Sequence, residues 1–277
     1  MPKERLHMLL ADESLRMLEA AGRLPASCGE LRFACLLGAV SPDMLFYDMP
    51  TFRLSGIGSA LHRLQGEAGA AFFREWLMEE GDRLPADVRA WMLGMAGHLL
   101  SDGYWHPAID SIVALPGGPC RLLGLSRGPC HHWVESELEA CWVGRVGEPD
   151  GYFAILARFR KERELTAKYA AWFMRFLERA GAGVVPDIRR ILRCLDRQAL
   201  LLAQFAEPGW ARWRPVLLKG RRTQHLGALL VPGTPRLPSC MAGGPEGPEN
   251  EKLCDGAFLA RAVFSLTERL AGLPVRL

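Results

Sequence analysis

The sequence contains no apolar run of the roughly 18 to 20 residues that a helix needs to span a bilayer. Its first fifteen residues also lack the uninterrupted apolar stretch of a secretory signal, because charged side chains between Glu4 and Glu13 interrupt them. Alternation of polar and apolar residues, the pattern of a half-buried strand, is scarce. These absences predict a protein without transmembrane segments, and we expect it to be cytoplasmic.

Paired cysteine motifs are absent as well. The chain has eight cysteines, but no two of them are separated by only two residues, which argues against a zinc knuckle or a thiol redox motif. Because disulfides are uncommon in the cytosol, we expect reduced thiols at all eight positions. These positions are Cys28, Cys35, Cys120, Cys130, Cys141, Cys194, Cys240 and Cys254.

An excess of charge of either sign is also missing. Lys plus Arg number 34 and Asp plus Glu number 31, so the formal charge of the chain is only +3. This balance is unlike that of a protein that binds nucleic acid or a membrane surface through its charge, and we expect no long nucleic acid among its partners. Because 49% of the 277 residues are hydrophobic and 23% are charged, the chain can bury a sizeable core and is not disordered.

Apolar residues at helical spacing dominate what the sequence does contain, as in Val88, Trp91, Met95 and Leu99. They predict an all-α fold, a multi-helix bundle that forms a single domain over residues 1–277. Two segments rich in glycine and proline, 115–129 and 231–250, are expected to be surface loops, the second of them mobile. The expected helices cover residues 5–22, 28–39, 56–80, 86–102, 129–145, 163–181, 186–205 and 252–272.

The histidines are distributed unevenly, since six of the seven fall in the first 132 residues and only His225 lies beyond. His98 and Asp102 are four residues apart in an expected helix, so they share one face of it and can bind a common cation. His131 and Glu135 repeat this spacing on a second expected helix. The two pairs predict nitrogen and oxygen donors that converge inside the bundle.

Either pair alone is typical of a solvent-exposed helix face, where it stabilises the protein very little. His98, however, lies in an apolar run, and burial of an imidazole with a carboxylate costs free energy unless the groups are paired or bind a metal. His106 follows just beyond the expected helix end and adds another nitrogen donor. Of the neighbours His131 and His132, only His131 has an acid four residues later, so we take His131 as the ligand.

The order of these residues along the chain is as informative as their types. It begins with His7, continues with the segment GAVSPD at residues 38–43 and with His62, and ends with His98-x-x-x-Asp102, His106 and His131-x-x-x-Glu135. This ordered set resembles the zinc-dependent phospholipase C family, which is related in fold to the single-strand-specific zinc nucleases. The resemblance covers most of residues 5–136.

The resemblance implies an all-α fold with a buried cluster of two or three zinc ions. Asp43 would both bind metal and act as the general base, Asp102 would bridge two ions, and Asp48 is the alternative to Asp43. Participation of His7 stays open, because it stands only six residues from Met1. The full set of implied metal ligands is His7, Asp43, His62, His98, Asp102, His106, His131 and Glu135.

The function that follows is that of a hydrolase, a metal-dependent phosphoesterase or phosphodiesterase that uses metal-activated water on a small phosphoester or phospholipid-like substrate. Two alternatives stay open. One is a non-catalytic helical protein with a structural metal, and the other is a zinc-dependent nuclease of the related fold. We favour catalysis, because the candidate ligands outnumber the four that a closed structural zinc site uses.

Overall fold

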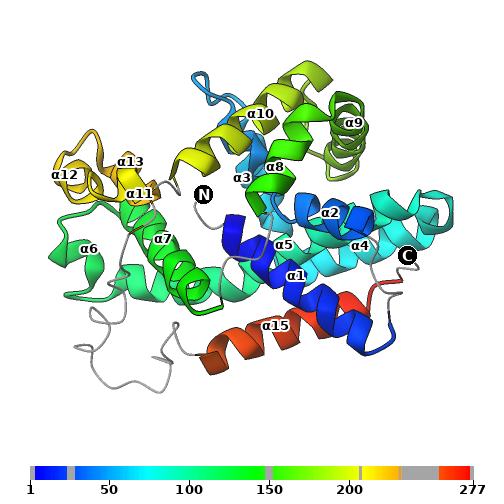
Figure 1. Ribbon diagram of the computed structural model, residues 1–277, viewed down its shortest axis with the longest axis horizontal. Coiled ribbons are helices and arrows are strands. Elements are labelled where there is room, and N and C mark those ends of the chain that lie inside the picture. The colour runs from blue at the N-terminus through cyan, green and yellow to red at the C-terminus, as the bar shows by residue number, and fades with distance from the viewer. Residues whose placement is uncertain are drawn as a thin grey trace. The chain divides into compact units, whose positions relative to one another are not determined.

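The computed structural model describes residues 4–23, 29–146, 152–205, 208–230, 232 and 256–274. All regular structure within these residues is helical (Figure 1), which confirms the predicted all-α class. None of the described helices is long and apolar enough to cross a membrane. The loop expected at 231–250 lies outside the described residues except for Pro232.

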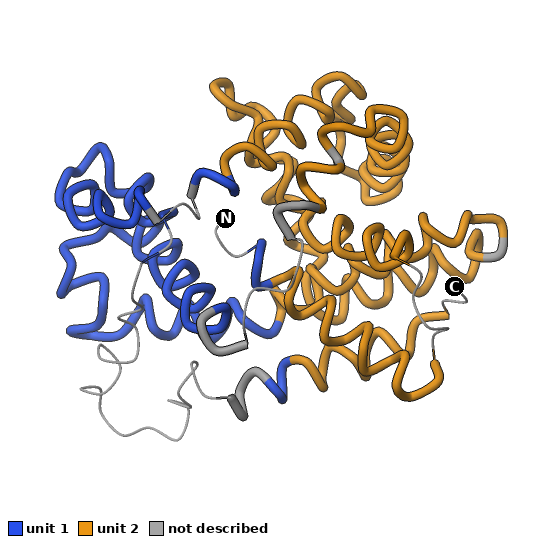
Figure 2. The backbone as a smooth tube through the Cα atoms, in the orientation of Figure 1, with its two compact units in different colours: residues 1–6, 104–150, 202–262 blue, residues 7–103, 151–201, 263–277 orange. Residues whose placement is uncertain are grey.

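Contacts divide the chain into two compact units, shown in Figure 2. Unit 2 comprises residues 7–103, 151–201 and 263–277, and unit 1 comprises residues 1–6, 104–150 and 202–262. The single domain over 1–277 stays a prediction. Four described helices contribute residues to both units: α1 (Glu4–Ala20), α5 (Ala86–Ala114), α10 (Ile188–Phe205) and α15 (Gly256–Ala271).

Unit 2 is built around buried aromatic side chains, among them Phe73, Trp76, Trp91, Phe173 and Phe176. The rings of Phe73 and Phe176 stack with their centroids 5.8 Å apart, which packs α4 and α9 together. Besides its parts of α1, α5 and α15, unit 2 contains α2 (Gly29–Gly38), η1 (Pro42–Tyr47), α3 (Ser55–Leu61), η2 (His62–Leu64), α4 (Glu67–Glu80), η3 (Gly81–Arg83), α8 (Tyr152–Lys161), α9 (Arg163–Arg179) and most of α10 (Ile188–Phe205).

Unit 1 has a smaller core, in which Trp133, Leu138 and Trp142 of α7 are buried. Short helices surround that helix, and α13 contacts both α7 and α12. The described helices of unit 1, besides its parts of α1, α5, α10 and α15, are α6 (Pro119–Leu122), α7 (Arg127–Val146), α11 (Pro208–Ala211), α12 (Arg214–Lys219) and α13 (Gln224–Leu229). The segment 115–129, expected to be a loop, therefore contains α6 and the start of α7.

The helix expected at 86–102 is longer than predicted, since α5 runs from Ala86 to Ala114. Pro107 cannot donate a backbone hydrogen bond and normally ends a helix. The apolar pattern nevertheless continues beyond it, and Ile109 and Ile112 are both buried. Burial of this extended face favours a continuous helix, so His106 lies inside α5 rather than beyond its end.

The helix expected at 56–80 is interrupted, and the structure has α3, η2 and α4 in its place. Gly66 has a φ of +66°, a conformation that glycine adopts readily and that ends the preceding helical path. Its backbone N–H donates to the carbonyl oxygen of Leu99 at 3.1 Å. This turn fixes the short η2 helix, and with it His62, beside α5.

The expectation of eight reduced thiols is wrong for Cys120 and Cys130, which form a disulfide. The chain reverses between α6 and α7, where the N–H of Leu125 donates to the carbonyl of Cys120 at 2.8 Å, and this brings the two Cα atoms to 5.3 Å. Disulfides are typical of oxidising compartments, so the cysteines no longer support a cytoplasmic location. Cys35, Cys141 and Cys194 are buried, and Cys28, Cys240 and Cys254 lie outside the described residues.

Asp48 connects the segment after η1 to α10 through Arg190. The Arg190 guanidinium donates to both carboxylate oxygens of Asp48, at 3.1 and 2.6 Å, and Thr51 Oγ1 and the Leu54 N–H donate to the same carboxylate. The hydrogen bond from Arg190 is the main reason that the pKa of Asp48 is lowered from 3.8 to about 2. The carboxylate is buried, so this ion pair stabilises unit 2 while Asp48 is ionised.

We expect Arg190→Gln to lower the free energy of unfolding at pH 6 by on the order of 2 kcal/mol. The folded state holds Asp48 ionised down to about pH 2, whereas the unfolded chain protonates it near 3.8, so the stabilisation is present above pH 4 and disappears as the pH falls toward 2. Urea unfolding of parent and variant at pH 6, 4 and 3 measures this. Arg193→Gln, an exposed arginine of the same helix, is the control. A difference from the parent that does not change with pH would contradict the assignment.

Candidate metal sites

Five residues of unit 2 bring nitrogen and oxygen atoms to one buried place. His62 Nε2 lies 3.0 Å from Asp43 Oδ1 and 3.3 Å from Asp102 Oδ2. His98 Nε2 lies 3.4 Å from Asp102 Oδ2 and 3.8 Å from Asp43 Oδ1. Asp43 and Asp102 are buried. His7 is the fifth residue, and overlapping sets drawn from the five have the spacing of a metal site.

The remaining ring nitrogens of His62 and His98 show which way their protons point. Nδ1 of His62 lies 2.8 Å from the Gly58 carbonyl oxygen, and Nδ1 of His98 lies 2.7 Å from that of Ala39. A carbonyl oxygen only accepts, so in each neutral ring the proton is on Nδ1 and Nε2 keeps its lone pair. The two Nε2 atoms are 3.3 Å apart. Two lone pairs and two carboxylates therefore face one another, an arrangement that a cation stabilises.

The spacing of these donors agrees with the geometry of zinc. Four ligands placed about 2.0 to 2.1 Å from a zinc ion at the corners of a tetrahedron are about 3.3 Å from one another. The separations of the two histidine Nε2 atoms from each other and from the oxygens of Asp43 and Asp102 run from 3.0 to 3.8 Å. Imidazole and carboxylate are also donors that zinc prefers. The residues present thus fit the metal that the sequence resemblance implies.

His7 joins this group from α1. Its ring stacks on that of His98 with centroids 3.8 Å apart, and its Nε2 lies 3.3 Å from Asp102 Oδ1. Its Nδ1 lies 2.8 Å from Ser101 Oγ, whose own proton is donated to the His98 carbonyl oxygen at 2.8 Å. Ser101 therefore accepts from His7 Nδ1, and the Nε2 lone pair of His7 points to Asp102. Asp102 faces His7 with one oxygen and His62 with the other, as a bridging carboxylate does.

A close crossing of α2 and α5 positions the Ala39 carbonyl for His98. A Cβ atom on Gly38 would lie 2.0 Å from the Trp91 carbonyl oxygen, and one on Gly94 would lie 1.9 Å from that of Cys35. Only residues without a Cβ allow the two helices to approach this closely. Ala39 follows the first glycine, and His98 lies one helical turn after the second. The glycines thus determine the hydrogen bond that orients His98.

The structure distinguishes Asp43 from its alternative Asp48. Asp43 lies in η1 and faces the histidines, whereas both carboxylate oxygens of Asp48 accept hydrogen bonds from Arg190. The positive charge of the Arg190 guanidinium therefore compensates the negative charge of Asp48. Of the two carboxylates, the geometry favours Asp43 as a donor to a metal.

Unit 1 contains a second group, formed by His106 of α5 with His131 and Glu135 of α7. Glu135 Oε1 lies 3.1 Å from His131 Nε2 and 3.8 Å from His106 Nε2. Nδ1 of His131 lies 3.5 Å from Asp110 Oδ1, so the carboxylate of Asp110 orients that ring. These spacings also fit a metal site, and they place His106, His131 and Glu135 together as the sequence predicts.

His132 contacts this second group rather than completing it. Its Nδ1 lies 3.1 Å from Glu135 Oε2, the carboxylate oxygen that His131 does not face. Burial lowers the pKa of His132, although Glu135 opposes that shift. Burial also raises the pKa of Glu139, one turn further along α7, to about 8. Glu139 is therefore mainly protonated at neutral pH.

Sequence reasoning missed several residues that contact these groups. The sequence could have indicated Asp110, because it follows His106 by four residues, but the helix was expected to end at residue 102. No sequence pattern indicates Ser101, since its contact with His7 depends on the packing of α1 against α5. His225, remote in sequence from the other histidines, has its ring 6.0 Å from that of His132. It therefore adjoins the second group.

Comparisons with known proteins agree with this geometry. Residues 6–180 match the family described as zinc dependent phospholipase C, which covers more than half of the chain. No curated protein and no solved structure gives a significant match. The matched residues include every candidate ligand in both groups. The chain belongs to the zinc-dependent phospholipase C family.

Proposed function

We propose that this protein is a zinc-dependent phosphoester hydrolase that acts on a small phosphoester or a phospholipid-like substrate. The observation that supports it most is the outward direction of the imidazole protons. His62 and His98 each use Nδ1–H on a backbone carbonyl, so their Nε2 lone pairs converge with the buried carboxylates of Asp43 and Asp102. Membership in the family adds support for hydrolysis of a lipid-type substrate.

In this proposal Asp43, His62, His98 and Asp102 would hold one zinc ion, and His7 and Asp102 would contribute to the binding of another. His106, His131 and Glu135 hold zinc in unit 1. These donors outnumber those of one closed structural site, which favours catalysis over a purely structural ion. The proposal therefore includes two or three ions.

Bound zinc supplies Lewis acidity and lowers the pKa of a coordinated water. The chain supplies the proton acceptor and the orientation. Asp43 is the carboxylate, of the alternatives Asp43 and Asp48, that faces the histidines, so we assign it the attacking water's proton. His62 and His98 keep their Nδ1 protons on carbonyl oxygens and stay fixed in direction throughout. Burial of the site excludes bulk water from the donors.

Metal content tests the ligands directly. We expect protein purified after zinc-replete expression to contain about two equivalents of zinc or more, and His98→Ala and Asp102→Asn each to lose about one or more. Asp196→Asn, a carboxylate that pairs with Arg163 away from the site, is expected to keep the parent content. Elemental analysis measures all four proteins. Equal zinc in the ligand variants and the parent would show that the ligands are misassigned.

Ser101 tests the orientation of His7. We expect Ser101→Ala to weaken zinc binding about tenfold, because His7 loses the acceptor that directs its Nε2 lone pair. Ser101→Thr keeps the hydroxyl and should bind as the parent does. Ser14→Ala, which removes another buried serine hydroxyl of unit 2, is the control. Competition with a chromogenic chelator measures affinity, and an unchanged affinity in Ser101→Ala would remove His7 from the ligand set.

The rate of phosphoester hydrolysis tests the proposed role of Asp43 as the proton acceptor. An activated phosphodiester and a short-chain phosphatidylcholine should be cleaved by the parent, lose cleavage with a chelator and regain it with zinc. Asp43→Asn refilled with zinc should turn over at least about 100-fold more slowly, whereas Asp196→Asn should match the parent. Parent-like turnover in refilled Asp43→Asn would direct attention to Asp48. Tight zinc binding without cleavage of any phosphoester would favour a structural role for the metal.

A further inference from the structure

Unit 1 has a surface whose composition differs from that of the whole chain. Residues 208–230, which contain α11, α12 and α13, include no Asp or Glu. Their exposed residues include the cations Lys219, Arg221 and Arg222 and the apolar Trp210, Trp213 and Val216. We call these six residues the basic apolar surface. Figure 1 shows α12 and α13 side by side next to α7.

The apolar members of this surface form a ridge. The N–H of Trp213 donates to the Trp210 carbonyl at 2.9 Å, and that of Val216 donates to the Trp213 carbonyl at 3.1 Å. Hydrogen bonds that span three residues place side chains at positions i and i+3 one above the other. The three side chains therefore line one edge of the chain, with exposed fractions of 43%, 48% and 60%. Large apolar side chains this exposed are typical of an interaction surface.

The described residues of unit 1 include few exposed anions. Among the described residues of that unit, Glu4, Glu135, Glu137 and Glu139 are all buried. Asp110, the other acid, faces Arg127 and His131. The exposed charge of the described part of unit 1 is therefore predominantly positive, although the whole chain is nearly neutral.

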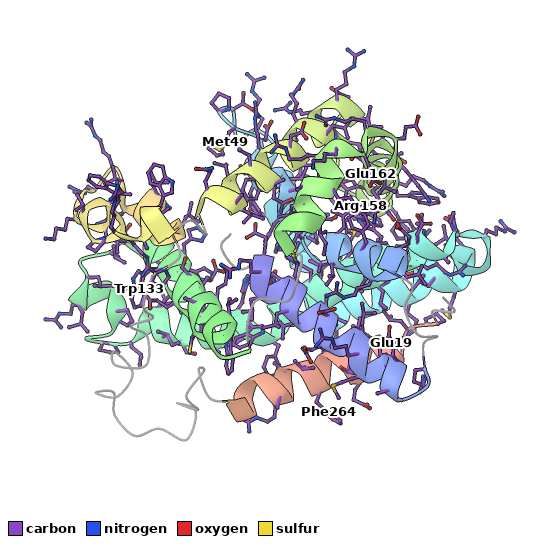
Figure 3. The ribbon with its side chains drawn as sticks, viewed as in Figure 1. Glu19, Met49, Trp133, Arg158, Glu162 and Phe264 are labelled. Atoms are coloured by element: carbon purple, nitrogen blue, oxygen red, sulfur yellow. A yellow bond between two sulfur atoms is a disulfide. The ribbon has the colours of Figure 1, made fainter. Side chains whose placement is uncertain are left out.

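The ridge is supported by a rigid base. Arg214, between Trp213 and Val216, is buried, forms an ion pair with Glu137 of α7, and lies 5.6 Å from the centre of the Trp133 ring. Figure 3 labels Trp133 on α7. Ser136 Oγ donates to the Ala228 carbonyl at 2.5 Å, which attaches α13 to the same helix. Because Arg214 fixes the start of α12 on α7 in this way, Trp213 directly before it and Val216 two residues after it are held in a defined position.

We propose that the basic apolar surface docks unit 1 on an anionic lipid bilayer. Tryptophans settle at the level of the lipid headgroups, and an aliphatic neighbour such as Val216 adds apolar area at the boundary with the acyl chains. Lys219, Arg221 and Arg222 complement the negative potential of the bilayer surface. A single-stranded nucleic acid would also use cations and aromatic rings, but it gives the exposed aliphatic side chain no partner. The proposal does not depend on the metal sites.

The test is co-sedimentation of the full chain with vesicles of phosphatidylcholine alone and of phosphatidylcholine mixed with phosphatidylglycerol. We expect binding to the mixed vesicles that weakens at high salt. Arg221→Gln with Arg222→Gln should lower affinity about 25-fold, since each surface cation contributes about fivefold. Trp210→Ala with Trp213→Ala should lower it at least about tenfold.

Matched controls change the same residue types elsewhere. Phe264→Ala removes an exposed aromatic ring of α15, labelled in Figure 3, and Arg189→Gln with Arg193→Gln removes two exposed cations of α10. Both should bind vesicles as the parent does. Asp43→Asn should also bind as the parent does, so that failure of hydrolysis and failure of docking are distinguishable. Circular dichroism verifies that each variant is folded.

Three results would overturn the proposal. The first is parent-like binding by both surface variants, and the second is equal binding of the parent to neutral and anionic vesicles. The third is a parent that ignores anionic vesicles but binds a single-stranded oligonucleotide, with that binding lost in the Arg221 and Arg222 variant. Loss of vesicle binding in the surface variants alone would support it.

Discussion

The candidate metal site in unit 2 depends on which ring nitrogen carries the proton in His62 and in His98. A neutral imidazole has one donor and one acceptor, so a carbonyl oxygen at Nδ1 determines the direction of the lone pair at Nε2. Gly58 and Ala39 supply those carbonyls, and the second is within reach because Gly38 and Gly94 let α2 and α5 cross without side chains between them. The packing of α2 on α5 therefore also determines how His98 is oriented. Replacement of either glycine would move these helices apart and, with them, the Ala39 carbonyl oxygen that accepts the hydrogen bond from His98.

Helix α5 carries candidate metal ligands in both units. It carries His98 and Asp102 in unit 2, and it continues past Pro107 with His106 and Asp110 in unit 1. The continuation is stabilised by burial of Ile109 and Ile112 rather than by anything at the site. A donor for the second group is therefore positioned by apolar packing. The residue that orients His131 follows on the same face one turn later.

The net charge of the whole chain does not show how the charges are distributed over its surface. A formal charge of +3 over 277 residues argues against a charged binding surface. In unit 1, however, four glutamates are buried while Lys219, Arg221 and Arg222 are exposed. The sum of charges is the same whether an acid faces solvent or the core, so only burial distinguishes these cases. The disulfide between Cys120 and Cys130 is likewise visible only in the structure. The spacing of these cysteines matches no motif, but the turn between α6 and α7 brings their Cα atoms together.

The sequence by itself determined the all-α class, most helix positions and the candidate ligands, because helical periodicity and i,i+4 spacing are local properties that need no partner. It favoured Asp43 but could not exclude the alternative Asp48, since what distinguishes them is the pairing of Asp48 with Arg190, 142 residues away. Nor could it find Ser101 or His225 beside the histidines, or the break at Gly66 and the continuation past Pro107. Each of these depends on contacts between residues distant in sequence, and such contacts exist only once the helices have packed against one another.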